Sequence, residues 1–243
     1  MNMTNAQLVL TEMESLGTEQ ARKTYQRHGV GDNVLGVSYA DLGKFQKKLK
    51  TNHEMALDLW DSGIHDAQVL ALMVADPQQA DSATLDKWVQ SLNNYVITDA
   101  FSGYVAITHL AQAKAEAWIQ SDNEWISTAG WNILGALATH DTPLPHAYFE
   151  HLLNVIERDL HSSKNRTRYA MNSVVIAIGG RNPLLQVKAV AAAKRIGKVQ
   201  VDHGLTNCKT PDAASYIQKV VDHKTKLAES NAIRKPAKSR VKA

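Results

Sequence analysis

A tyrosine and an aspartate lie one helical turn apart in an apolar stretch near the middle of the chain. Tyr95 and Asp99 belong to the segment 92–101, whose other residues are apolar enough to form a buried helix. Residues four apart share one face of a helix, so we expect the carboxylate and the aromatic ring at one spot. Two interpretations remain open. Asp99 either cross-links helix ends within a satisfied polar network, or is a carboxylate kept in a dry cleft.

Basic residues form a second group of candidates, at expected helix starts in the C-terminal half. Lys164, Arg166 and Arg168 open one expected helix, and Arg181 precedes another. Free backbone N–H groups and the helix dipole favour anions at a helix N-terminus, and nearby cations add to this effect. Successive helix ends of a helical repeat protein line one concave surface, so these residues are candidates for contacts with a nucleic-acid backbone.

Three potential metal ligands, Asp202, His203 and Cys208, lie close together in the polar loop 202–210. Zinc sites need four ligands in tetrahedral geometry, and the nearby sequence offers neither a second cysteine nor paired histidines. The chain also lacks a P-loop, a dinucleotide fingerprint, a zinc-protease helix and a nucleophile elbow. We therefore predict no metal, no cofactor, and a loop held by its own side-chain hydrogen bonds.

Composition narrows the class of protein. The chain has 243 residues, a formal net charge of +3 and the single cysteine Cys208. One cysteine cannot form an internal disulfide and fits a reducing compartment. The N-terminus lacks the features of a secretion signal, and no later run is apolar enough to span a membrane. We predict a cytoplasmic protein that does not enter membranes.

The basic charge is concentrated at the C-terminus. Between residues 224 and 243 the only acidic residue is Glu229, whereas basic residues recur throughout. Such a segment cannot bury apolar surface, so we predict a folded domain over residues 1–229 and a disordered basic tail over 230–243. The tail is either an arm that binds nucleic acid or a solubilising end.

Helical periodicity runs along nearly the whole chain. Leu85, Trp88, Val89 and Leu92 show the spacing of one helix face, and the strand-like run 199–201 stands alone. Helix starts are marked by expected N-caps, which are Thr18, Ser38, Ser82, Asp122 and Asn182. Helices of about 10 to 15 residues in apparent pairs predict an all-α, HEAT-like solenoid, an α-α superhelix. An irregular helical bundle is the alternative.

Several of these segments, in their order and spacing, resemble the DNA alkylation repair family, which includes the AlkD-type alkylpurine DNA glycosylases. The segments are 57–63 (LDLWDSG), the helix 66–75, 95–99, 121–126 (SDNEWI) and 160–164 (LHSSK). The resemblance spans roughly Thr18 to Pro183. It implies stacked HEAT-like helix pairs that hold duplex DNA in a basic concave groove. It also implies removal of N3- or N7-alkylated purines, for which one aspartate can stabilise the charge that develops on the deoxyribose.

Carried over to this chain, the resemblance makes Asp99 the catalytic aspartate, and Tyr95 replaces a tryptophan that packs on the lesion's sugar. Two family features are missing. An arginine that follows the equivalent of Trp125 and Ile126 is replaced by Ser127 and Thr128. A second sugar-facing tryptophan falls at or near Ser173, and Trp131 is a candidate to compensate for the first loss.

We therefore predict a DNA-binding protein of alkylation repair, a monomer acting on duplex DNA, which hydrolyses the N-glycosidic bond of alkylated purines. Asp99 and Tyr95 are the predicted catalytic residues. The predicted DNA-binding residues are Trp125, Lys164, Arg166, Arg168 and Arg181. One alternative is a non-catalytic relative that binds bent, branched or damaged DNA. Another is a helical scaffold for a protein partner.

Overall fold

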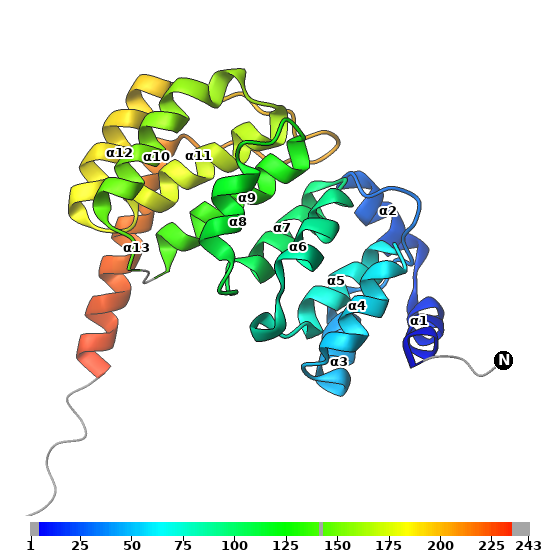
Figure 1. The fold of residues 1–243 in the computed structure, drawn as a ribbon. Helices are drawn as coiled ribbons and strands as arrows, with labels where there is room; N and C mark the ends of the chain where they lie inside the picture. Colours follow the sequence, from blue (N-terminus) through cyan, green and yellow to red (C-terminus); the bar gives the residue numbers. More distant parts are fainter. Residues whose placement is uncertain (1–4, 141–142, 235–243) are drawn as a thin grey trace, which may run out of the picture.

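A computed structural model describes residues 5–140 and 143–234, and all regular secondary structure in these ranges is helical (Figure 1). This confirms the predicted fold class. The α-helices are α1 (Asn5–Leu16), α2 (Glu19–Arg27), α3 (Tyr39–Leu49), α4 (His53–Asp61), α5 (His65–Val74), α6 (Ser82–Gln90), α7 (Tyr95–Val105), α8 (Ala111–Trp118), α9 (Glu124–Thr139), α10 (His146–Asp159), α11 (Asn165–Gly179), α12 (Pro183–Ile196) and α13 (Ala213–Arg234). Two short 3₁₀ helices are η1 (Pro77–Gln79) and η2 (Leu160–Ser162).

The helix starts follow from local capping chemistry. Thr18, Ser38 and Asn182 cap their helices as predicted, each accepting a backbone N–H in the first turn. Two predicted caps are wrong by one residue. Asp81, not Ser82, accepts from the N–H groups of the first turn of α6, and Asn123, not Asp122, does so at α9.

The helices form two layers along a curved array, with α1 and α13 at opposite ends (Figure 1). One layer runs in succession through α3, α5, α7, α9, α11 and α13, each in contact with the next. Helices of the other layer pack against it, as α4 does on α5, α8 on α9 and α12 on α11. This repeated pairing buries one apolar core that extends from α1 to α13.

Aromatic rings fill the middle of the core. Trp60 and Trp88 are stacked with their ring centroids 4.4 Å apart, and Phe101 of α7 lies 5.9 Å from Trp60. Phe101 is completely buried, as are Ile97 and Thr98 to within 1%. These three residues orient α7, because its buried face must point into the core and its opposite face outward.

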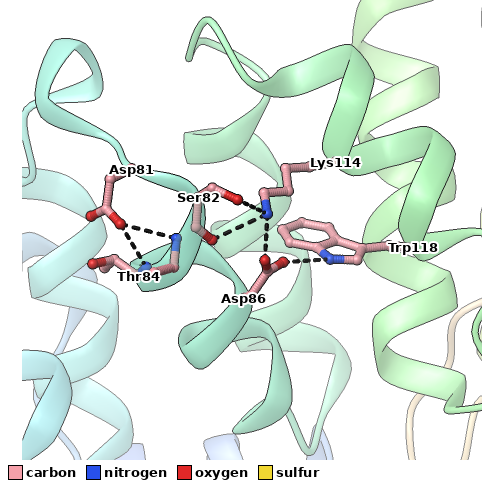
Figure 2. Close-up of polar contacts among 7 residues, drawn as sticks. Asp81, Ser82, Thr84, Asp86, Lys114 and Trp118 are labelled. Carbon is pink, nitrogen blue, oxygen red and sulfur yellow. Dashed lines mark hydrogen bonds and ion pairs between the residues drawn. The ribbon is translucent and has the colours of Figure 1, made fainter.

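An ion pair between a buried lysine and an exposed aspartate joins α6 to α8 (Figure 2). The Lys114 ammonium lies 2.6 Å from an Asp86 oxygen and also donates to the backbone oxygen and hydroxyl of Ser82. The Trp118 indole donates to the second Asp86 oxygen at 3.2 Å. Every polar group of this network has a partner, so it is a structural cross-link between helices.

The C-terminal helix extends beyond the predicted domain boundary. α13 continues to Arg234, past residue 229, and the rest of the predicted tail, 235–243, lies outside the described residues. The strand-like run 199–201 is irregular, and the described part of the chain contains no strand. No described helix is both long and apolar enough to cross a membrane.

Candidate nucleic-acid interface

The start of α7 places Tyr95 and Asp99 on its outward side. The Asn94 side chain accepts hydrogen bonds from the N–H groups of Val96 and Ile97, so the helix begins at Tyr95. Because Ile97 packs into the core, Tyr95 remains half-buried and Asp99 remains exposed. Burial is the main cause of the raised Tyr95 pKa, the positive charge of Arg166 opposes it, and the negative charge of Asp99 makes a smaller contribution that raises it. The two side chains therefore occupy one electrostatic environment.

Asp99 is an open carboxylate and not a closed cross-link. One of its oxygens accepts a hydrogen bond from the Asn132 amide of α9 at 2.8 Å. The side chain is accessible to solvent but closely flanked by protein, and this partial burial raises the pKa of its carboxyl. The Asn132 hydrogen bond and the positive charge of Arg166 oppose that shift. The second oxygen has no protein donor among the described residues.

Tyr95 is held between a histidine and an arginine. Its hydroxyl is hydrogen-bonded to the His28 imidazole, whose ring lies edge-on with centroids 5.9 Å apart. The Arg166 guanidinium lies over the Tyr95 ring at 4.1 Å from its centroid. A cation at this position is attracted by the negative π-face of the ring. One face of Tyr95 is therefore already covered by a cation of the protein itself.

Arg166 is positioned by three contacts at the start of α11. Its backbone N–H donates to the Glu124 carboxylate at 2.6 Å, and its guanidinium lies over Tyr95 and, at 5.0 Å, over Tyr169. Its Nε is buried and has no hydrogen-bond partner among the described residues. Stacking thus fixes the plane of the guanidinium, and its two terminal nitrogens, which bond to no described residue, remain the groups that can hydrogen-bond to a ligand.

A cavity of about 400 Å³ opens beside this cation, and we call it the Arg166 cavity. It is lined by Gln26, Arg27, His28, Gly29, Asn94, Tyr95, Glu124, Trp125, Asn165, Arg166, Asp202, His203, Gly204 and Leu205. Its wall at 202–205 is tied to α11, because the Asn165 amide exchanges two hydrogen bonds with the backbone of Asp202 at 2.8 and 2.7 Å. The cavity combines two arginines and aromatic rings with the carboxylates of Glu124 and Asp202, each of which already accepts a backbone N–H group. The guanidinium groups are therefore the groups in it that suit a phosphate-bearing ligand.

The structure brings together only part of the predicted DNA-binding set. Trp125 and Arg166 line the Arg166 cavity with Tyr95. Lys164 faces a different cavity and donates to the backbone oxygen of Asp122. Arg168 donates to the backbone oxygen of Gln200.

The Arg181 side chain is used within the fold, at the end of α9. Its guanidinium donates to backbone oxygens at the end of α9, among them those of Ala138 and His140, and lies 4.6 Å over the Phe149 ring. It therefore stabilises the C-terminus of α9, where a positive charge is favourable. Arg181 does not line the Arg166 cavity, and its role in phosphate binding stays a prediction without geometric support.

The position of the missing family arginine is closed, whereas Ser173, where the second tryptophan is missing, is half-buried. Ser127 and Thr128, which replace the expected arginine, are 6% and 3% exposed, and the Thr128 hydroxyl pairs with that of Thr167. Trp131 is only 3% exposed, so it does not compensate from the surface as suggested. Arg166, on a different helix, is instead the guanidinium that reaches Tyr95.

Sequence reasoning did not assign four residues to this site, one of which, His203, was considered only as a metal ligand. Tyr169 follows Arg166 by three positions and shares its helix face, which was a usable signal. Asn132, His28 and His203 join the site only through tertiary packing. His203 lies edge-on to Tyr169 at 5.5 Å and bonds to the Thr210 hydroxyl. Asp202 accepts from the N–H of Gly204, so the loop does hold itself together as predicted.

Comparisons with known proteins identify the family of this chain. The model of the DNA alkylation repair enzyme family matches residues 9–217. An uncharacterised protein of Listeria innocua and one of Listeria monocytogenes are each 34% identical over 215 residues, covering 86% of this chain and 94% of theirs.

A solved structure superimposes with a TM-score of 0.83 and 28% identity, covering 91% of this chain and 95% of the other. It is described as a new family of proteins related to the HEAT-like repeat DNA glycosylases with affinity for branched DNA structures. This likeness confirms the predicted HEAT-like fold. The match over most of the chain shows that it belongs to the DNA alkylation repair enzyme family.

Proposed function

We propose that the protein binds DNA through the Arg166 cavity and the adjoining Asp99 carboxylate, and that branched or damaged DNA is preferred over regular duplex. The observation that carries this proposal is the Arg166 guanidinium, stacked on Tyr95 at 4.1 Å with a buried Nε that lacks a partner among the described residues. A preorganised guanidinium binds phosphate at low entropic cost. The affinity of the solved relative's family for branched DNA supports the choice of DNA form.

The covered face of Tyr95 disfavours sugar-directed catalysis. Glycosidic cleavage of an alkylated purine places positive charge on the deoxyribose, and an enzyme accelerates it by placing negative charge or dipoles nearby. Here the Tyr95 ring that would pack on the sugar carries Arg166 on one face. A second positive charge close to the developing cation raises its energy. DNA recognition without cleavage is therefore the better fit.

N-glycosidic hydrolysis of N3- or N7-alkylated purines is the second candidate, and Asp99 favours it. Its carboxylate is accessible, and Asn132 orients one of its oxygens at 2.8 Å. In this mechanism Asp99 stabilises the oxocarbenium-like transition state and orients the attacking water. The free purine base leaves, and the water oxygen bonds to the sugar carbon from which the base departed.

A binding series tests the leading proposal. Affinity for a four-way junction, a gapped duplex and an intact duplex of equal length is measured between low and physiological salt. We expect tightest binding to the junction, with log affinity falling by about one power of salt for each phosphate contacted. Equal affinity for all three DNAs contradicts the proposed preference for branched or damaged DNA over intact duplex. Absent or salt-independent binding contradicts DNA binding and favours a scaffold for a protein partner.

A release assay tests the second candidate separately. Duplex DNA treated with a methylating agent is incubated with the wild type and with Asp99→Asn, and free methylpurines are quantified. Release by the wild type that is lost in Asp99→Asn supports glycosylase activity. Equal release by both proteins removes Asp99 from that role. No release by a wild type that binds DNA leaves recognition as the function.

A further inference from the structure

A second cavity, of about 490 Å³, adjoins the first and has different chemistry. It lies between α2, the start of α3 and the start of α7, and we call it the Tyr39 cavity. It is lined by Thr18, Gln20, Ala21, Thr24, Tyr25, His28, Ser38, Tyr39 and Val96. His28 lines both cavities, so they are adjacent.

The two cavities divide charged from neutral groups. The Arg166 cavity contains Arg27 and Arg166 together with Glu124 and Asp202, whereas no Lys, Arg, Asp or Glu lines the Tyr39 cavity. The two carboxylates accept backbone N–H groups, of Arg166 and Gly204 respectively, while the Arg166 guanidinium has no carboxylate partner in the described part of the chain.

The Tyr39 cavity instead offers aromatic rings and uncharged hydrogen-bonding groups. The Gln20 amide and the Tyr39 hydroxyl have no hydrogen-bond partner within the described ranges. These are the groups expected around a neutral planar heterocycle with a polar edge.

Tyr39 is a rigid and exposed aromatic ring. It is the first residue of α3, fixed by the Ser38 cap, and is 53% exposed. Tyr25 supports it from behind, with ring centroids 6.3 Å apart. Tyr25 is itself held by its hydroxyl, which donates to the Val37 oxygen at 2.8 Å, and by the edge-on ring of His65. An exposed ring held this firmly loses little entropy when a base stacks on it.

The Tyr39 cavity also lies within electrostatic range of Asp99. Burial is the main cause of the raised Tyr39 pKa, and the charges of Asp66 and Asp99 add to it. Val96, which lines the cavity, directly follows Tyr95. The two cavities are therefore close enough for neighbouring parts of one ligand to occupy both.

We propose that the Tyr39 cavity binds one unpaired nucleobase of a DNA strand whose phosphate lies in the Arg166 cavity. The pair of cavities matches the division of a nucleotide into an anionic phosphate and a neutral aromatic base. Tyr39 provides the stacking surface, and Gln20 hydrogen-bonds to the edge of the base. This inference rests on the proposed DNA binding and adds the part of the DNA that the protein recognises.

Two matched DNA probes test the inference. Both are duplexes with a one-nucleotide bulge, which carries 2-aminopurine in one probe and a baseless tetrahydrofuran residue in the other. The wild type should bind the base-containing probe about tenfold tighter, the typical contribution of one base stacked on an aromatic ring. Stacking on Tyr39 should also lower the 2-aminopurine fluorescence on binding.

Three variants locate the effect. Tyr39→Ala should abolish the preference for the base-containing probe, whereas Tyr39→Phe, which keeps the ring, should retain most of it. Thr24→Phe places an aromatic ring at the exposed rim of the cavity and should also abolish the preference. Thermal unfolding verifies that each variant is folded. Because Thr24 is exposed, its variant tests the cavity even if Tyr39→Ala is unstable.

The outcomes separate the two proposals. Equal wild-type affinity for both probes, or a preference that survives in Tyr39→Ala and Thr24→Phe, overturns the base site but leaves salt-dependent DNA binding in place. Failure of the wild type to bind any of the DNAs at low salt overturns the proposed function and the base site together.

Discussion

Asp66 and Asp99 lie on neighbouring helices of the same layer, α5 and α7, and the structure uses them in opposite ways. Asp66 is completely buried, and its two oxygens accept the N–H groups of Leu35 and Val37, each at 2.7 Å. Asp99 is exposed and has one protein donor, the Asn132 amide. Both aspartates lie in largely apolar helices, so the hydrophobicity of the surrounding sequence does not predict which of the two carboxylates is buried.

The difference lies in what faces each carboxylate. Asp66 faces the segment 28–38, which supplies two backbone donors and closes over it. Asp99 lies near Asn132 and the Arg166 guanidinium and keeps an oxygen without a described protein donor. A carboxylate with all its partners inside the protein stabilises the fold, whereas one with an open oxygen can meet a ligand. The Lys114 and Asp86 pair belongs with Asp66 in this respect (Figure 2).

The largest expected effect is on stability, from Asp66→Ala. The change leaves two backbone N–H groups without partners, and Val37 is completely buried. Hydrogen bonds to a charged group contribute about 1.5–3 kcal/mol each, so we expect a loss of about 3 kcal/mol in the free energy of unfolding. Urea denaturation measures it. Asp61→Ala is the control, because Asp61 forms an exposed pair with Lys87 and should change stability by less than about 1 kcal/mol. Equal losses in both variants contradict the assignment of Asp66.

Lys114→Met should destabilise the fold by a smaller amount without affecting DNA binding. The Lys114 side chain is 10% exposed and donates three hydrogen bonds, but its partner Asp86 is 52% exposed and stays hydrated when the pair is lost. We expect a loss of about 1–2 kcal/mol. Denaturation and DNA titration are measured on the same preparation. A clear loss of DNA affinity in this folded variant would show that the Lys114 network takes part in DNA binding. It would contradict its assignment, with Asp66, to the groups that only stabilise the fold.

Arg166→Gln should show the reverse pattern. The guanidinium stacks on two tyrosines, so its removal should cost at most about 1 kcal/mol of stability. We expect DNA affinity to fall about tenfold and the salt dependence to decrease by about one phosphate contact. Arg195→Gln is the matched control, because Arg195 is an arginine paired with Glu157 outside the cavity. Similar affinity losses in both variants would indicate a general effect of net charge.

Local signals in the sequence were sufficient for most helix positions. Caps such as Thr18, Ser38 and Asn182 act on N–H groups two or three residues away, so their effect can be predicted without knowledge of the fold. Where two polar residues compete, as at Asp81 and Ser82, the choice depends on which one adopts the extended backbone conformation of a cap. Composition alone does not decide that.

The candidate site could be predicted only where its contacts are local. The shared face of Tyr95 and Asp99 follows from a spacing of four residues. The stack of Arg166 on Tyr95 joins α11 to α7, and the His28 hydrogen bond joins α2 to α7. These contacts depend on the curvature of the helix array and on packing between repeats. Tertiary packing also decides the role of Arg181. Its residue type and its place before a helix suggested a phosphate ligand, but its guanidinium donates to a backbone oxygen at the end of α9.

The smallest expected change in the free energy of unfolding comes from Asp99→Asn. This variant should be slightly more stable than the wild type, whereas Asp66→Ala should be less stable. Burial raises the pKa of Asp99, so the folded state binds its proton more tightly than the unfolded state does. Stability therefore falls as pH rises through the interval between the unfolded and folded pKa values of this group. At neutral pH the ionised carboxylate is a small net cost, which the asparagine removes while its side-chain oxygen can still accept from Asn132.

We expect Asp99→Asn to have a slightly higher unfolding temperature than the wild type near pH 7, with a difference that disappears below about pH 4, where the wild-type carboxyl is also protonated. Thermal unfolding across this pH range measures it. Destabilisation at neutral pH would show that Asp99 is a structural cross-link like Asp66. Stabilisation combined with altered DNA binding or base release would show that the protein retains an unfavourable charge at this position for its interaction with DNA.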